Sequence, residues 1–463
     1  MEDVFMDLVI FGGTIVTMGS EGVIRDGAVV VEGDTIVDVG KSDEIKRKYS
    51  RYEKIDAGGK VVMPGLINTH QHAAMSLLRG YADDYPLKEW LERWVWPLER
   101  HMTGYDIYVG ALLTAVESVM GGTTTVNTMY HYMVDYNEAM ALAEVGLRGV
   151  VGHVCFSWRK EHDKRALEDL ARRWHRKAGG RIRVSVDPHA PYTVDPEYMR
   201  ELRALTRELN ERYGSVDAPI IWHIHLAETV DEAQKIKDSF GITIPDGVVD
   251  YVDSLGVLAG DVVAAHCVHL TPRDIEILSL RNVKVAHNPI SNMKLASGIS
   301  PIPGLLRAGV TVALGTDSPC SNNSADMFEV MKFAALLHKG VNGNPTLLPA
   351  EVTLRMATVN GARALLWDNE IGSIEVGKKA DIIIVNFRSP HLWPIYNEIS
   401  HLVYAAKASD VETVIINGQI IMENREIKTV NVEEVMEKAK KAQEKLIERA
   451  VQNRRPFMEE NAI

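Results

Sequence analysis

Two histidines, one residue apart, end an apolar stretch near the start of the chain: PGLINTHQH, residues 64–72, closes with His70 and His72. In a strand, residues two apart face the same side, so both imidazoles would point to one face. With 16 histidines among 463 residues, chance alone gives roughly half an occurrence of this pair. The pair becomes informative only if other reactive side chains reach the same place.

Similar polar side chains end several later apolar runs, and these residues are His189, His223, His225, His266 and Asp317. Neutral imidazoles and one carboxylate are ligands that Zn²⁺ or Fe²⁺ prefers, with one position left open for water. A cation would also explain the carboxylate, because an unpaired buried charge costs several kcal/mol. The pattern therefore predicts a metal site. Core histidines satisfied by hydrogen bonds are the alternative.

The elements that must position these residues form a regular series beyond Pro64. Eight short apolar runs alternate with helical patterns that end in glycine. The runs cover residues 66–72, 123–130, 148–155, 181–190, 219–228, 261–270, 282–289 and 309–318. This repetition is typical of an α/β protein with a closed (β/α)₈ barrel of the TIM type, whose reactive groups gather at the carboxyl ends of the strands. The rival, an open doubly wound sheet, would bring a GxGxxG loop that the sequence lacks.

Both ends of the chain are rich in short β-type runs. Residues 7–63 contain three of them, and the same texture returns after about residue 372. We predict one small β-sandwich domain built from residues 1–63 and 372–430, with the metal-dependent barrel, residues 64–371, inserted between them. The last segment, 431–463, is predicted as an amphipathic C-terminal helix on the surface.

Composition excludes several classes of function. The net charge is −12 and no basic cluster occurs, which argues against a nucleic-acid partner. No run reaches the roughly 18 apolar residues of a membrane span, and the acidic start is unlike a signal peptide, so we predict a cytoplasmic protein. The three cysteines are scattered and are interpreted as small buried hydrophobic residues.

The motifs PGLINTHQH, HLAE, AHCV, HNPISN and LGTDS together resemble those of the amidohydrolase superfamily over nearly the whole chain. The resemblance implies one divalent metal ion per subunit, Zn²⁺ with Fe²⁺ as the alternative, because the fourth strand lacks the lysine that bridges two ions in binuclear relatives. It implies that Glu228 is the proton shuttle, that His266 orients or polarises the attacked centre, and that Asp317 also holds the attacking water. The implied metal ligands are His70, His72, His225 and Asp317.

Within the superfamily, the segments LLRGYADD, EWLERWVWPLE, PHAPYT and TDSPCSNNS resemble deaminases of 5′-methylthioadenosine and S-adenosylhomocysteine. The resemblance implies conversion of an adenine nucleoside, possible substrates including adenosine and 5′-deoxyadenosine, to the inosine analogue and ammonia. Trp90 would form an apolar wall, Glu99 would accept hydrogen bonds from the ribose, and Arg165 and His189 would grip the 5′ substituent. His153 stands where that subgroup can carry an arginine. The implied substrate contacts are Trp90, Glu99, His153, Arg165, His189, Glu228 and Ser321.

Two other functions stay open on the sequence alone. An enzyme of the same fold could act on guanine, cytosine or an s-triazine, including dechlorination, and an inactive scaffold of this fold is the third possibility. The expected partner is a small-molecule nucleoside, and the chain is expected to form a homo-oligomer, a dimer or tetramer. Residues given a structural or surface interpretation are His131, His162, His223, His269, His287 and Asn288.

Overall fold

The computed structural model describes residues 7–452, and its central feature is a parallel sheet of eight strands in the order β6 to β13. Each strand lies inside one of the eight predicted runs, so the predicted barrel is confirmed. The first and last strands meet where Asp317 N donates to His70 O at 3.0 Å and Thr69 Oγ1 donates to Leu314 O at 2.8 Å. The strands are β6 (Leu66–Gln71), β7 (Thr123–Tyr130), β8 (Arg148–Cys155), β9 (Ile182–Pro188), β10 (Ile221–Leu226), β11 (Val262–His266), β12 (Lys284–His287) and β13 (Val312–Leu314).

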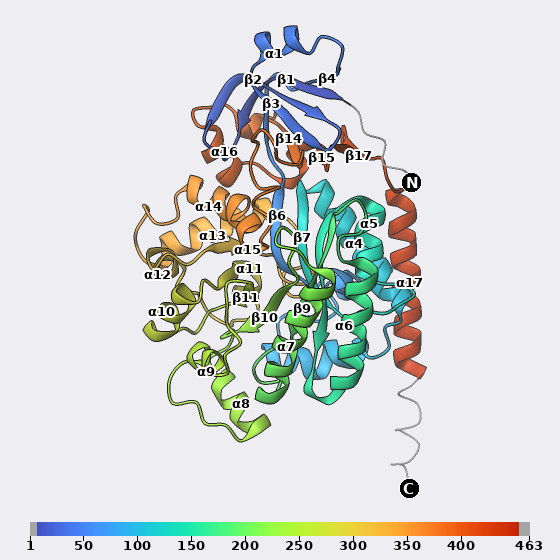
Figure 1. Ribbon diagram of the computed structural model, residues 1–463, viewed down its shortest axis with the longest axis vertical. Helices are drawn as coiled ribbons and strands as arrows, with labels where there is room; N and C mark the ends of the chain where they lie inside the picture. The colour runs from blue at the N-terminus through green and yellow to red at the C-terminus, as the bar shows by residue number, and fades with distance from the viewer. Residues whose placement is uncertain (1–6, 453–463) are drawn as a thin grey trace.

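Helices follow the barrel strands and cover the outside of the barrel (Figure 1). Capping side chains mark where two of these helices begin. Thr271 forms a capping box with Asp274, and Asp195 caps the helix that starts at Pro196. The main helices are α4 (Gly104–Met120), α5 (Glu138–Val145), α6 (Lys160–Trp174), α7 (Pro196–Tyr213), α8 (Glu232–Phe240), α9 (Val248–Ser254), α10 (Pro272–Leu280), α11 (Pro289–Lys294), α12 (Ile302–Arg307), α13 (Met327–Val341), α14 (Ala350–Met356) and α15 (Val359–Ala364).

The two ends of the chain build a second sheet of nine strands at one end of the molecule (Figure 1). Strand β14 from the C-terminal part pairs antiparallel with β5 from the N-terminal part, so residues far apart in the sequence share one sheet, as predicted. Helices α1 (Ser42–Lys48) and α16 (Glu398–Tyr404) flank it. Its strands are β1 (Leu8–Val16), β2 (Val23–Glu32), β3 (Thr35–Lys41), β4 (Glu53–Asp56), β5 (Lys60–Pro64), β14 (Ile382–Asn386), β15 (Val411–Ile416), β16 (Gln419–Glu423) and β17 (Glu426–Ile427).

The last helix, α17 (Val432–Gln452), runs along the outside of the barrel beside α4 (Figure 1). It buries a stripe at helical spacing, Val435, Ala439, Ala442 and Leu446, and Arg449 pairs with Asp106 on α4. Residues 453–463 of the predicted tail lie outside the described residues.

The amino end of the barrel is closed by an apolar cluster that includes Val150, Val263, Trp367 and Ile371. The three cysteines are buried and free, as interpreted from the sequence. Within residues 7–452, no helix has both the length and the apolar composition that a membrane crossing needs.

Candidate active site

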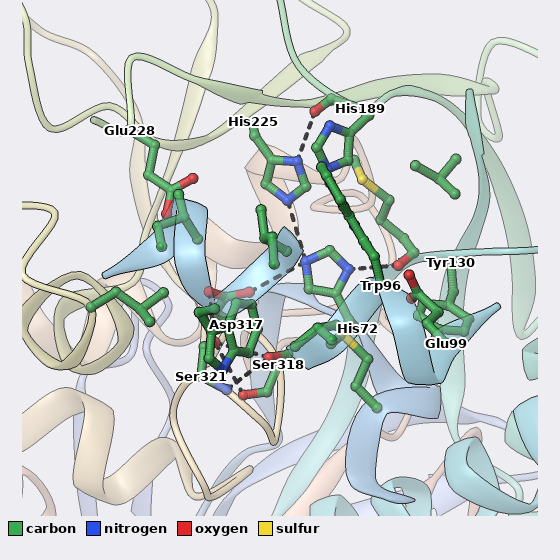
Figure 2. Close-up of a pocket in the computed structure, with 18 of the residues that line it drawn as sticks. His72, Trp96, Glu99, Tyr130, His189, His225, Glu228, Asp317, Ser318 and Ser321 are labelled. Carbon is green, nitrogen blue, oxygen red and sulfur yellow. Dashed lines mark hydrogen bonds and ion pairs between the residues drawn. The ribbon is translucent and has the colours of Figure 1, made fainter. Parts of the chain in front are cut away.

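Four of the predicted residues, His70, His72, His225 and Asp317, converge at the carboxyl end of the barrel. Figure 2 shows three of them, His72, His225 and Asp317. The Asp317 carboxylate places Oδ1 3.3 Å from Nε2 of both His70 and His72, and Nε2 of His72 lies 3.2 Å from Nε2 of His225. These residues come from β6, β10 and the segment after β13. The structure thus brings together the whole predicted ligand set.

The protons of these imidazoles show that the cluster fits a cation. Nδ1 of His72 lies 2.7 Å from the backbone carbonyl oxygen of Met129. Nδ1 of His225 lies 2.7 Å from the backbone carbonyl oxygen of His189. A carbonyl oxygen only accepts, so in each neutral ring Nδ1 carries the proton and Nε2 exposes a lone pair. Two lone pairs that face each other at 3.2 Å repel unless a positive charge lies between them. In metal proteins, a hydrogen bond from the other ring nitrogen to such a carbonyl orients histidine ligands in the same way.

His223, interpreted from the sequence as a structural residue, lies directly behind this cluster and is fully buried. Its Nε2 lies 2.8 Å from Nδ1 of His70, and the Nε2 of His70 is buried with no hydrogen-bond partner. Burial lowers the pKa of His70 well below its ordinary value, which favours the neutral form that binds metal. Burial acts to raise the pKa of Asp317, but His70 and His72 hold it well below the ordinary value. The aspartate therefore supplies a negative charge.

The backbone is strained where the polar side chains leave the strands. His266, Asp317 and Ala227 have φ values of 74°, 61° and 52°, in the left-handed region that L-residues rarely adopt. Such strain is held only where the surrounding structure enforces it, and it concentrates at functional sites.

Glu228 and His266 lie beside the ligand cluster and are both nearly buried. Oε2 of Glu228 is 4.0 Å from Nε2 of His266, and Nδ1 of His266 lies 2.8 Å from Oδ1 of Asn292. Burial raises the pKa of Glu228 above its ordinary value. The raised pKa brings this carboxyl group nearer to the range in which a general acid–base group exchanges protons.

A narrow inner chamber, of about 80 Å³, opens directly onto these groups. Trp90, Glu99, His189 and Ser321 all line it, as their predicted role as substrate contacts requires. Figure 2 shows Glu99 and Glu228 at opposite ends of this chamber. A wider outer chamber, of about 1190 Å³, adjoins it and shares Trp96, Glu99, His131 and Phe156 with it.

Two predicted substrate contacts are not available in the structure. Arg165 is exposed on α6 and lines neither chamber, because it lies two residues from the buried Asp163 and so on the opposite side of the helix; its predicted grip on the substrate is wrong. His153 does border the outer chamber, but its Nδ1 accepts from Tyr132 N and its Nε2 lies 3.0 Å from Asp163. Both ring nitrogens are used within the protein, so His153 supports the chamber wall.

The sequence analysis also missed several residues of the site. His131, interpreted as a surface or loop residue, follows β7 directly and lines both chambers, with Nε2 3.9 Å from Glu99. Ser291 was also overlooked: it donates to Oδ2 of Asp317 at 2.5 Å, beside the predicted Ser321, which donates to the same atom at 2.9 Å. Asn292, which contacts His266, was overlooked as well. The quoted motif HNPISN contains Ser291 and Asn292, so that motif was the signal that could have found them.

The other histidines interpreted as structural or surface residues lie away from the ligand cluster. His287 contacts His338 through their Nε2 atoms at 3.1 Å, His269 contacts Ser297 O at 2.6 Å, and His162 is largely exposed at the rim of the outer chamber. Asn288 stands behind His266, with 3.3 Å between Nδ2 and Nδ1.

Comparison with known proteins gives one family. The profile of the Amidohydrolase family matches residues 61–421, and a short profile of the Imidazolonepropionase-like composite domain of bacteria matches residues 27–49. The 5-methylthioadenosine/S-adenosylhomocysteine deaminase of Thermoanaerobacter pseudethanolicus is 45% identical over 96% of this chain and 100% of its own length. The 5′-deoxyadenosine deaminase of Methanosarcina acetivorans is 44% identical over 96% of this chain and 99% of its own.

Solved structures agree with these sequence relatives. An adenosine deaminase from Xanthomonas campestris with bound zinc superposes with a TM-score of 0.87 and 33% identity, covering 95% of this chain and 98% of that one. A mutant atrazine chlorohydrolase from Arthrobacter aurescens, complexed with zinc and atraton, has a TM-score of 0.84 over 94% of this chain and 100% of its own, at 22% identity, which speaks for the fold alone. From the family profile and these full-length relatives, the chain belongs to the amidohydrolase family.

Proposed function

We propose that the protein is a hydrolytic deaminase that converts an adenine nucleoside to the inosine analogue and ammonia. The observation that carries this proposal is the placement of Glu228, a buried carboxyl group with a raised pKa, beside the ligand cluster and at the end of the chamber opposite Glu99. One end of the chamber then handles protons, and the other end is suited to hydroxyl groups.

The residues divide the chemistry between them. His70, His72, His225 and Asp317 would hold a divalent cation, which supplies activation of a water molecule as nucleophile at neutral pH. Glu228 would take a proton from the nucleophile, pass it to the ring nitrogen and help protonate the departing amine. His266, held by Asn292, faces Glu228 and would stabilise charge on the attacked centre. Ser291 and Ser321 fix the Asp317 carboxylate through its other oxygen.

The walls of the two chambers suit a nucleoside with a 5′ substituent. Glu99, which is nearly buried, can accept hydrogen bonds from ribose hydroxyls, and contact with His131 lowers its pKa against the opposing effect of burial. Phe156 stacks on Trp158 and His189 with centroid distances of 4.6 and 4.8 Å. This aromatic stack between the chambers favours 5′-methylthioadenosine, S-adenosylhomocysteine or 5′-deoxyadenosine, and the names of the relatives support the same group.

A screen for ammonia release tests the proposal. Metal-analysed protein would be incubated with adenosine, 5′-deoxyadenosine, 5′-methylthioadenosine and S-adenosylhomocysteine, and with guanine, cytosine and s-triazines. We expect release from the adenine nucleosides only. Ammonia release confined to guanine, cytosine or a triazine, or chloride release from a chlorinated triazine, would replace the proposed substrate class. Release of neither product from any compound would favour an inactive scaffold.

The identity and number of metal ions belong to the same proposal. We propose one Zn²⁺ per subunit, with Fe²⁺ as the alternative, since both suit imidazole and carboxylate ligands. Replacing Asp317 with Ala should lower metal occupancy and turnover together, as measured by elemental analysis and ammonia release. Full occupancy and rate in that variant would remove Asp317 from the ligand set.

The cellular setting of the enzyme stays a prediction. We propose a cytoplasmic protein without nucleic-acid or membrane partners, on the grounds of composition and charge given above. We also propose a homo-oligomer, a dimer or tetramer, because large barrels of this kind commonly form them. The division into residues 1–63 with 372–430, 64–371 and 431–463 likewise stays our proposal for the domains.

A further inference from the structure

Glu232 is a buried carboxylate to which the mechanism above gives no role. It is the first residue of α8, a place where acidic side chains usually meet solvent, yet it is only 1% exposed. Its Oε1 accepts the backbone N–H of Ala227 at 3.1 Å, and its Oε2 accepts the backbone N–H of Glu228 at 2.8 Å. Both oxygens are therefore used on the turn that carries Glu228.

That turn needs to be held. Ala227 has φ of 52°, and an L-residue in the left-handed region costs about 1 kcal/mol or more. The carbonyl of Ala227 accepts from the N–H groups of Val268 and His269, each at 2.9 Å. The turn after β10 is thus tied to the segment after β11, just beyond His266.

The side chain of Glu228 has little to hold it directly. Its nearest polar contacts are Ser297 Oγ at 3.5 Å and His266 Nε2 at 4.0 Å, both longer than an ordinary hydrogen bond. The position of the Glu228 side chain must therefore be set by its own backbone. Glu232 binds that backbone by accepting the N–H of Glu228. Burial raises the pKa of Glu232 to about 7, while the N–H groups of Glu228 and Ala227 favour its charged form. In that form the carboxylate is well suited to hold the turn, because both donors are polarised toward one negative group.

We infer that Glu232 is a positioning residue for the reaction: by clamping the N–H groups of Ala227 and Glu228, it aims the Glu228 carboxyl group at the reacting centre. This inference rests on the proposed function and adds to it a residue that touches neither substrate nor metal. A misplacement of about 1 Å in a catalytic group can cost roughly 100-fold in rate, so loss of the clamp should appear in kcat.

The direct test is Glu232→Gln in the full-length, metal-loaded protein. The amide keeps the size of the side chain but turns an NH₂ group toward one of the two N–H donors, so one hydrogen bond is replaced by repulsion. We expect kcat to fall by about 10- to 100-fold, while KM and metal content stay within about twofold of the wild type. Asp231→Asn is the matched control: it removes a neighbouring charge that pairs with Lys235 and touches neither N–H group, so its kcat should stay unchanged.

A double-mutant comparison separates positioning from a general structural effect. If Glu232 acts only through Glu228, Glu232→Gln should cause no further loss in a Glu228→Gln background, measured as residual ammonia release in long incubations. Glu232→Asp, which is too short to reach both N–H groups, serves if the Gln variant does not fold, and should lower kcat several-fold.

Two results would overturn the inference: unchanged kcat in both Glu232 variants, or an equal loss with and without the Glu228 carboxylate. Failure of the proposed function would look different, since the wild type itself would then release no ammonia from adenine nucleosides.

Discussion

The two ends of the barrel use buried charges in opposite ways. At the amino end, Arg148 on β8 makes two bonds to Asp381, at 2.8 and 2.9 Å, and Arg183 pairs with Glu370 at 2.8 Å while lying 3.9 Å from the ring centre of Trp367. At the carboxyl end, imidazole lone pairs face each other and the backbone is strained. Paired charges stabilise the amino end, and lone pairs that lack a positive partner make the carboxyl end reactive.

Glu228→Gln, at the carboxyl end of the barrel, is expected to have the largest effect of the variants compared here, and the effect is on turnover. Loss of the proton-carrying carboxyl group should lower turnover by about 10³-fold, within the range for general acid–base groups. Metal content and melting temperature should match the wild type, because Glu228 lies outside the ligand set. Ammonia release, elemental analysis and thermal unfolding measure the three quantities, and near-normal turnover would remove the proton-shuttle role.

Arg148→Met should produce the reverse result at the paired end. It leaves the Asp381 carboxylate buried without its guanidinium partner, so the free energy of unfolding should fall by about 3 kcal/mol or more. Turnover of the folded enzyme should not change. Denaturant unfolding provides the measurement, and Arg273→Met is the control, because Arg273 is exposed and its surface ion pairs contribute little to stability. Equal stability of the two variants would refute the contrast.

A smaller effect at the amino end depends on pH. His175 contacts Ala218 O through Nε2 and Val184 N through Nδ1, and burial lowers its pKa to about 4. A lowered histidine pKa means that its contribution to stability is complete above about pH 6.5 and is lost as the pH falls toward 4. His175→Gln can keep both hydrogen bonds without titrating, so its stability loss between pH 7 and pH 5 should be smaller by about 2 kcal/mol.

Denaturant unfolding at the two pH values checks this expectation, with His162→Gln at an exposed position as the control. A parallel loss of stability in the wild type and in His175→Gln would show that the buried histidine is not responsible.

Glu99→Gln should give the smallest effect, a loss in kcat/KM. It tests whether the two ends of the inner chamber have different roles, with ribose binding at Glu99 and proton transfer at Glu228. The amide is a weaker acceptor for ribose hydroxyls, so kcat/KM for the preferred nucleoside should fall by about tenfold. The loss should lie mainly in KM, since Glu99 is at the end of the chamber far from Glu228. Steady-state kinetics measure this, and an equal loss for a free adenine base would contradict the ribose contact.

The sequence predicted the barrel and a group of candidate ligands for a simple reason: strand ends in a parallel barrel converge at one rim. The choice of His70, His225 and Asp317 from that group came from the resemblance to the amidohydrolase superfamily. Residues on the connecting segments were harder to place. Placing Arg165 correctly required knowing which side of α6 faces the barrel. Residues two positions apart on a helix lie on nearly opposite sides, so Asp163 is buried and Arg165 is exposed. His131 and Glu232 were overlooked because their roles come from tertiary contacts, and no spacing pattern marks those.

The hydrogen bond from Asp317 N to His70 O closes the barrel beside the ligands themselves. The first barrel strand supplies two imidazoles, and the aspartate comes from the segment after the last strand, nearly 250 positions later. A nascent chain still on the ribosome and shorter than 317 residues therefore cannot present the complete ligand set. Cofactor loading must wait until synthesis has passed this point, which keeps an unfinished barrel from carrying a finished catalytic centre.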